Sequence, residues 1–140
     1  MNSSYIITFI ADDRPGLVEQ LSAVIKQSEG NWLESSLSQL GGKFAGLILV
    51  SLPQENAAAM EKDLAALDPG CLSVSVTATG EQAPPAAGSS VTLSVLGPDR
   101  QGIVREISRV LAREQINVTQ LDSAVNSAPM SAEMIFSARI

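Results

Sequence analysis

Hydrophobic residues in the first part of the chain follow two different periods. Residues 4–11 (SYIITFIA) form a short apolar run rich in β-branched and aromatic side chains, which predicts a strand. From Leu17 to Ile25, apolar residues recur at the spacing of one helix face. We therefore expect a strand followed closely by an amphipathic helix, with Gly30 in the position that commonly ends a helix.

The next segments complete a recognisable order of elements. Residues 32–40 and 43–52 flank Gly41-Gly42, a sequence typical of a β-hairpin turn. Residues 54–67 predict a second helix, and residues 71–79 alternate between apolar and small polar side chains, as a strand with one buried face does. The order β-α-β-β-α-β favours a ferredoxin-like α+β fold, with strand order 4-1-3-2 and both helices on one face.

The second part of the chain repeats this pattern and then stops early. Residues 91–96 predict a strand, and the helix after it carries apolar residues displaced by 86 from those of the first helix. Residues 118–125 and 132–140 predict a hairpin, and the sequence ends before a second helix or a fourth strand. Between the two parts, a stretch rich in Gly, Pro, Ala and Ser predicts a linker. We expect a first domain at 1–79, a linker at 80–90 and an incomplete βαββ domain at 91–140.

Both predicted helices begin with the motif Asp-Arg-x-Gly, once in ADDRPGLV and again in GPDRQGIV. Glycine in the first turn of a helix costs about 1 kcal/mol relative to alanine, so its repetition calls for a reason. One hypothesis is that the missing side chain lets a ligand or a partner backbone approach, while free N–H groups attract a carboxylate. The alternative is duplication of a stable module, with Asp12 or Asp13 as helix cap, Pro15 in the first turn and glycine required by packing.

Composition excludes several classes of function. The chain of 140 residues has one cysteine, Cys71, and no histidine, so a disulfide, Cys–His catalysis and the usual zinc ligands are excluded. We expect Cys71 to be a small buried hydrophobe and the protein to be cytoplasmic, without enzymatic activity, cofactor, metal or membrane segment. The net charge of −6 argues against direct nucleic-acid binding.

Two further features allow more than one interpretation. Arg105, Arg109 and Arg113 fall at i, i+4 and i+8 and would line one helix face, either as a solvated surface or as a docking surface for an acidic partner. Trp32, the only tryptophan, could cover a ligand or pack at a sheet edge.

The motif and its setting resemble a known family. A strand–helix unit with DRPGLV after its first strand and Asn31 at the entry to its second strand is similar to an ACT domain, and DRQGIV with Asn117 resembles it equally. Two tandem units without a catalytic domain resemble the glycine cleavage system transcriptional repressor family. That resemblance implies a regulator that senses a small amino acid, glycine or serine, and contacts a transcription activator.

The resemblance also implies where a ligand binds, at the helix-start turn of one unit beside a strand of another. The corresponding positions are Asp13, Arg14, Pro15, Gly16 and Asn31 in the first unit, and Asp99, Arg100, Gln101, Gly102 and Asn117 in the second. The two arginines could instead stay solvated or pair with nearby carboxylates.

Two other functions stay open. Similar ACT units precede the catalytic domains of phosphoserine phosphatases and formyltetrahydrofolate deformylases, so the chain could be the regulatory fragment of such an enzyme. It could also be a module that only joins subunits. An incomplete second domain would expose the edge of strand 91–96 and an apolar sheet face, so we expect a homodimer through this strand or the helix at 100–114.

Overall fold

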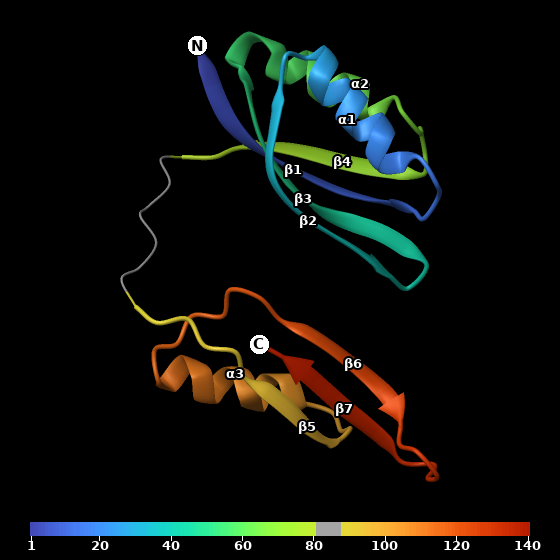
Figure 1. Ribbon diagram of the computed structural model, residues 1–140, viewed down its shortest axis with the longest axis vertical. Coiled ribbons are helices and arrows are strands. Elements are labelled where there is room, and N and C mark those ends of the chain that lie inside the picture. The colour runs from blue at the N-terminus through green and yellow to red at the C-terminus, as the bar shows by residue number, and fades with distance from the viewer. Residues whose placement is uncertain (81–87) are drawn as a thin grey trace. The chain divides into compact units, whose positions relative to one another are not determined.

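The computed structural model describes residues 1–80 and 88–140, which belong to two compact units (Figure 1). We call residues 1–80 unit 1 and residues 88–140 unit 2. Residues 81–87, most of the predicted linker, lie outside the described residues.

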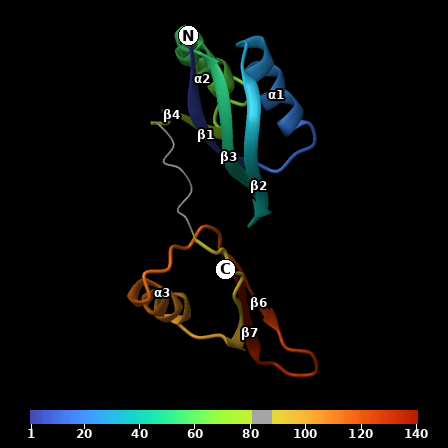
Figure 2. The same ribbon diagram turned by 60° about the vertical axis from the view of Figure 1, so that its left-hand side comes forward.

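Unit 1 has the predicted order of elements. Its strands and helices are β1 (Asn2–Asp12), α1 (Leu17–Gln27), β2 (Asn31–Leu40), β3 (Lys43–Pro53), a 3-10 turn (Gln54–Asn56), α2 (Ala57–Ala65) and β4 (Leu72–Ala78). The four strands form an antiparallel sheet in the order β2-β3-β1-β4, and both helices lie on one face of it (Figure 2). This confirms the predicted α+β ferredoxin-like fold.

The core of unit 1 follows from the two hydrophobic periods. Alternate residues of β1 and β3 face the helices, and apolar positions of α1 and α2 meet them. The fully buried large side chains are Ile7, Leu17, Leu21, Ile25, Ile48, Val50, Leu52, Met60 and Leu64. Each such side chain contributes roughly 1.5–3 kcal/mol of burial, so this face of the sheet is the main source of the unit's stability.

The ends of α1 differ from the sequence-based expectation. Gly16 is the N-cap residue, and no side chain caps the helix. Asp12 pairs with Lys43 and Asp13 accepts a hydrogen bond from Gln39, so the expected aspartate cap is wrong, and Pro15 precedes the helix.

At the other end, the left-handed residue is Glu29 (φ 62°) rather than Gly30. Gly30 N donates to Ile25 O at 2.8 Å, the i to i−5 bond of a Schellman motif. A Cβ on Gly30 would lie 2.9 Å from that same oxygen, so this glycine is explained by close packing. Unit 2 has the same motif, with Gln115 at φ 56° and Ile116 N donating to Leu111 O.

The burial of Cys71 and Trp32 can be compared with what the sequence predicts. Cys71 is exposed, so its predicted burial is wrong. It lies in the turn before β4, where its N–H donates to Asp68 O, and not on the inner face of the sheet. Trp32 is half-buried and packs against the core from β2, in line with packing near the sheet edge.

Unit 2 contains β5 (Ser94–Pro98), α3 (Ile103–Arg113), β6 (Asp122–Ser127) and β7 (Met134–Arg139), with α3 on one face of a sheet in the order β5-β7-β6. The expected βαββ order is therefore present, although all three strands begin later than predicted. Leu93 exchanges two hydrogen bonds with Ile140, and pairing begins there because a strand needs a partner for its backbone groups. No helix among the described residues is long and apolar enough to cross a membrane.

Candidate ligand-binding site

The turns that lead into α1 and α3 have the same backbone geometry. Gly16 lies at φ 85° and ψ −1°, and Gly102 lies at φ 84° and ψ 4°. This left-handed conformation costs a residue with a Cβ roughly 1–2 kcal/mol, which gives a local reason for glycine in both copies. A Cβ at either position would meet nothing within 4 Å, so the packing explanation is wrong. Both turns are open on the side where the side chain is missing.

Each turn presents backbone donors. Gly16 O accepts from Gln20 N at 3.0 Å, and Gly102 O accepts from Glu106 N at 3.0 Å, which begins the helical hydrogen-bond pattern. The backbone N–H groups that precede Gln20 in α1 and Glu106 in α3 have no partner inside their helix. No side chain caps the start of either helix. Uncapped N–H groups and the helix dipole together favour an anion, such as a carboxylate.

The two arginines of the motif bond within their own units. Arg14 Nε lies 3.3 Å from Asp68 Oδ2, and its Nη2 donates to Gln20 at 2.6 Å. Arg100 donates to both carboxylate oxygens of Glu106. Of the alternatives predicted for Arg14 and Arg100, the structure shows pairing with nearby acceptors.

These contacts have electrostatic consequences in unit 2. The hydrogen bonds from Arg100 hold the pKa of Glu106 below its ordinary value, and the charge of Arg100 adds to that effect. In return, Glu106 raises the pKa of Arg100, so the guanidinium stays charged. In unit 1, the hydrogen bond and charge of Asp12 raise the pKa of Lys43 in the same way.

The two aspartates of the motif differ in their surroundings. Asp13 Oδ2 accepts a hydrogen bond from Gln39 Nε2 at 2.6 Å, at the tip of the β2–β3 hairpin. The Asp99 carboxylate has no hydrogen bond or ion pair among the described residues, while its backbone N–H donates to Met134 O at 2.9 Å. Pro15 and Gln101 are exposed in the turns beside them. The acidic side chain is thus more available in unit 2.

Asn31 lies far from the turn of its own unit. In the register of the sheet, Asn31 and Ser4 both lie beside Ser51 of β3, whereas Asp12 lies beside Lys43 at the other end of that strand. The strand from Ser4 to Asp12 spans about 26 Å at about 3.3 Å per residue. One small amino acid therefore cannot contact both the asparagine and the glycine turn of unit 1.

The same separation holds in unit 2. The 11 residues of α3 lie between Gly102 and Asn117, a length of about 16 Å. Both asparagines are exposed. The structure thus brings the four turn residues of each motif together and leaves each asparagine at the other end of its helix.

Sequence reasoning missed one pair of residues at these turns. Gln20 and Glu106 each receive the motif arginine from six residues upstream, and they too are 86 residues apart. The internal repeat therefore contained the signal that could have found them. Among the described residues, no group of three or more His, Cys, Asp or Glu side chains is arranged to hold a metal ion.

Several hollows lie outside the turns among the described residues. One, of about 360 Å³, opens at the edge of unit 1 and is lined by Ile10, Ala11, Lys43, Gly70, Cys71, Leu72 and Ser73. Another, of about 100 Å³, lies beneath α3 and is lined almost entirely by apolar side chains, Val118 and Phe136 among them. Neither contains a residue of the predicted ligand set.

Comparison with known proteins shows what the chain is similar to. Residues 3–68 match the family model described as ACT domain. A crystal structure of an unknown protein from Galdieria sulphuraria matches with a TM-score of 0.81 and 27% identity, covering 99% of this chain and 80% of that one. A crystal structure described as "putative glycine cleavage system transcriptional repressor" matches with a TM-score of 0.70 and 20% identity, covering 100% and 81%. No curated protein matches the sequence.

Proposed function

Since residues 3–68 are an ACT domain and unit 2 repeats its fold, we propose that this chain is an amino-acid-responsive regulator of the glycine cleavage system repressor type. ACT domains are regulatory modules that bind amino acids. The observation that carries the proposal is the repeated glycine turn, which has matching φ and ψ values and an open, uncapped helix start in both units.

The ligand in this proposal is a small amino acid, glycine or serine. Its carboxylate would meet the free N–H groups at the start of α1 or α3. Its ammonium group would need carboxylate or amide oxygens, which Asp99 and the asparagine of a second unit can supply. Because the turn and the asparagine lie at opposite ends of a helix, ligand binding would join two units and so change how they associate.

The regulator would act through a protein partner, a transcription activator, and without binding DNA itself. Two features support this proposal. The similarity to the repressor-like structure extends over the whole chain, and the chain has an excess of acidic residues. A continuation of the gene into a long catalytic domain would favour the alternative, a regulatory fragment of an enzyme.

The test is calorimetry of the full chain with glycine and serine, and with glutamate as a bulkier amino acid. The variants Gly16→Asn and Gly102→Asn add a side chain to the open side of each turn. Asparagine tolerates the left-handed conformation, so these variants should stay folded. We expect binding of glycine or serine in the wild type and its loss in the double variant. Absence of binding at millimolar amino acid would contradict the sensor and leave a module that only joins subunits.

We also propose that the chain forms a homodimer through unit 2. In unit 1, β1 pairs with β3 on one side and β4 on the other, whereas β5 pairs with β7 alone among the described strands. Leu96 on this edge strand is 78% exposed. Exposed edges with apolar side chains tend to pair with another chain.

Light scattering tests the dimer directly. We expect a dimer at tens of micromolar and a shift towards monomer for Leu96→Lys, because charge on an edge strand opposes pairing. The exposed Leu40→Lys change at the β2–β3 hairpin is the matched control. A wild-type monomer at these concentrations would rule out this association.

A further inference from the structure

Three arginines form a stripe along the solvent face of α3. Arg105, Arg109 and Arg113 are spaced by four residues, so they lie on one side of the helix over about 12 Å. All three are exposed, and none takes part in a hydrogen bond or an ion pair among the described residues. Glu106, on the same helix, is already bonded to Arg100. The three guanidinium groups of the stripe therefore form no ion pair among the described residues, although Arg109 lies near enough to Glu106 for its charge to lower the pKa of that carboxyl.

Unit 1 shows that this stripe is not a requirement of the fold. At the same displacement of 86, the solvent face of α1 has Glu19, Ala23 and Gln27. The inward positions of the two helices, by contrast, are apolar in both copies, with Leu17, Leu21 and Ile25 matched by Ile103, Ile107 and Leu111. The repeat thus keeps its core and differs in charge at all three outward positions.

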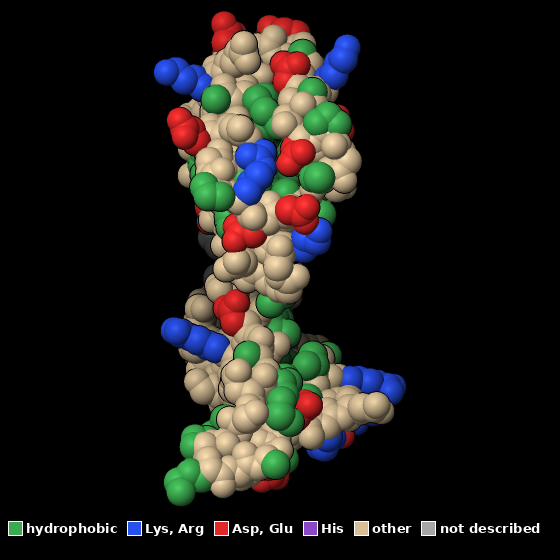
Figure 3. Space-filling view, turned by 90° about the vertical axis from the view of Figure 1, so that its right-hand side faces the viewer, with side chains coloured by type: hydrophobic (Ala, Val, Ile, Leu, Met, Phe, Trp, Pro, Cys, Tyr) green, Lys and Arg blue, Asp and Glu red, His purple; other side chains and the backbone are tan. Residues whose placement is uncertain are grey.

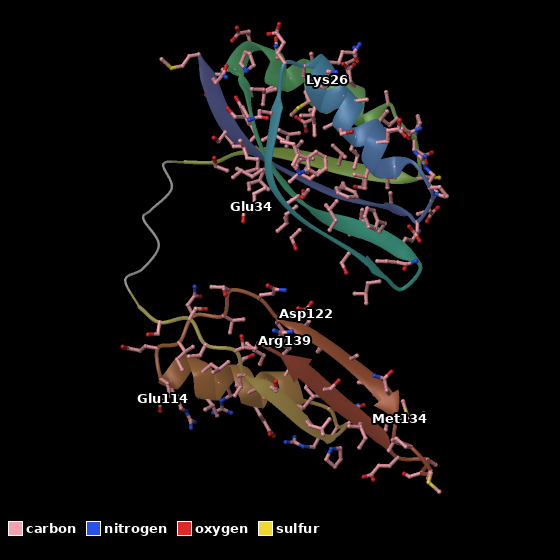
Figure 4. The ribbon with its side chains drawn as sticks, viewed as in Figure 1. Lys26, Glu34, Glu114, Asp122, Met134 and Arg139 are labelled. Atoms are coloured by element: carbon pink, nitrogen blue, oxygen red, sulfur yellow. The ribbon has the colours of Figure 1, made fainter. Side chains whose placement is uncertain are left out.

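The charge difference extends to the units as a whole. Residues 1–80 contain nine acidic and four basic side chains, whereas residues 88–140 contain five of each. Without the three arginines of the stripe, residues 88–140 contain five acidic and two basic side chains, so the positive charge of unit 2 is concentrated in the stripe. Glu114 follows the stripe at the end of α3 (Figure 4). Figure 3 shows Lys and Arg side chains that project outward from the lower unit beside exposed hydrophobic ones.

We propose that this stripe (Arg105, Arg109 and Arg113) is a docking surface for an acidic segment of a protein partner. Guanidinium groups bond carboxylates in a two-pronged geometry, and carboxylates one helical turn apart would match the spacing of the stripe. A nucleic acid fits less well, because nucleic-acid-binding surfaces are usually strongly basic and this chain has a net charge of −6. This proposal rests on the proposed function in one respect, because it assigns a binding surface to the protein partner proposed there.

The test is an NMR titration of the full chain with a synthetic helical peptide that carries Glu at positions i, i+4 and i+8. We expect chemical-shift changes at α3 that fade when the salt concentration is raised. The variant Arg109→Ala/Arg113→Gln gives α3 the residues of α1 at two positions and should weaken binding about tenfold, as two surface ion pairs are lost. The variant Lys26→Gln/Lys62→Gln removes the same charge from exposed sites on α1 and α2 and should change binding less than twofold. Lys26 is labelled in Figure 4.

Three results would overturn the proposal. These are no shifts at α3 with the Glu peptide, equal weakening by both double variants, or stronger shifts of the same amides with a short DNA duplex. The third result would assign the stripe to nucleic acid. Calorimetry with glycine on the Arg109→Ala/Arg113→Gln variant keeps the two proposals apart, because the amino-acid turns are unchanged there and ligand binding should persist.

Discussion

The two units begin with the same strand, turn and helix, yet they bury that helix to different depths. Leu21 of α1 is fully buried, whereas Ile107 at the same position of α3 is only half-buried. Val24 is 7% exposed and its counterpart Val110 is 57% exposed. The cause is the rest of the unit, because α2 packs beside α1 and contributes Met60 and Leu64 to the core. Periodicity thus decides which face of a helix turns inward, and neighbouring elements decide how far it is removed from water.

A second difference lies beneath the helices. In unit 1, Trp32 and Phe44 pack against the core, and Phe44 lies 5.8 Å from Phe9 between ring centres. In unit 2, the position of Trp32 is taken by Val118, which lines the cavity of about 100 Å³ under α3. A smaller side chain at an equivalent position leaves space that its neighbours do not fill.

The largest expected effect separates the two units by core truncation. Leu21→Ala should lower the free energy of unfolding of unit 1 by about 2–5 kcal/mol, since it removes a fully buried side chain. Ile107→Ala should cost unit 2 less than half as much, because its side chain is already partly in water. Trp32, the only tryptophan, reports unit 1 by fluorescence during denaturation, and amide hydrogen exchange reports unit 2. Equal losses in both units would contradict the difference in burial.

A smaller effect should be the same in both units. Gly16→Ala and Gly102→Ala each place a Cβ on a left-handed residue and should destabilise their units by roughly 1–2 kcal/mol. The asparagine variants at these positions should cost less. Gly97→Ala is the control, because its φ is not positive and a Cβ there meets nothing within 4 Å. A large difference between the two alanine variants would mean that the turns are not equivalent.

The smallest effect concerns pH and is confined to unit 2. The pKa of Glu106 is lowered by Arg100, so the contact stabilises unit 2 above the ordinary pKa of glutamate and is lost as pH falls through the lowered value. Carbon-13 NMR of the Glu106 carboxyl should show its titration below that of an exposed glutamate. Arg100→Gln should return the titration to the ordinary range, and failure to do so would mean that the pair does not persist in solution. Unit 1 has Gln20 at this position, which does not titrate.

Sequence reasoning succeeded wherever the signal was local. Gly41-Gly42 predicted the hairpin, and both residues have positive φ in the turn between β2 and β3. It failed where a residue outside the segment decides the outcome. The sequence predicts Asp12 or Asp13 as the cap of α1, but Lys43 and Gln39 from the hairpin hold the two carboxylates. Residues 118–121 were expected to belong to a strand, yet Val118 and Leu121 line the cavity under α3 before β6 begins.

The candidate site also has features that the sequence predicted and features that it did not. The repeat of 86 residues identified both turns from the sequence alone, and their glycines share one backbone conformation. The contact of Arg14 with Asp68 could not be foreseen, because Asp68 comes from the segment between α2 and β4, 54 residues away. The distance between each asparagine and its own turn follows from the helix that separates them, α1 in unit 1 and α3 in unit 2.

By itself, the sequence determined the order of elements, the inward face of each helix and the two glycine turns, because hydrophobic period and backbone conformation depend on neighbours within a few residues. Only the tertiary structure decided the depth of burial of α1 and α3, the contact of Arg14 with Asp68 and the hydrogen bond from Gln39 to Asp13. Each of these depends on surfaces supplied by segments far away in the chain, and no local pattern encodes where those surfaces meet.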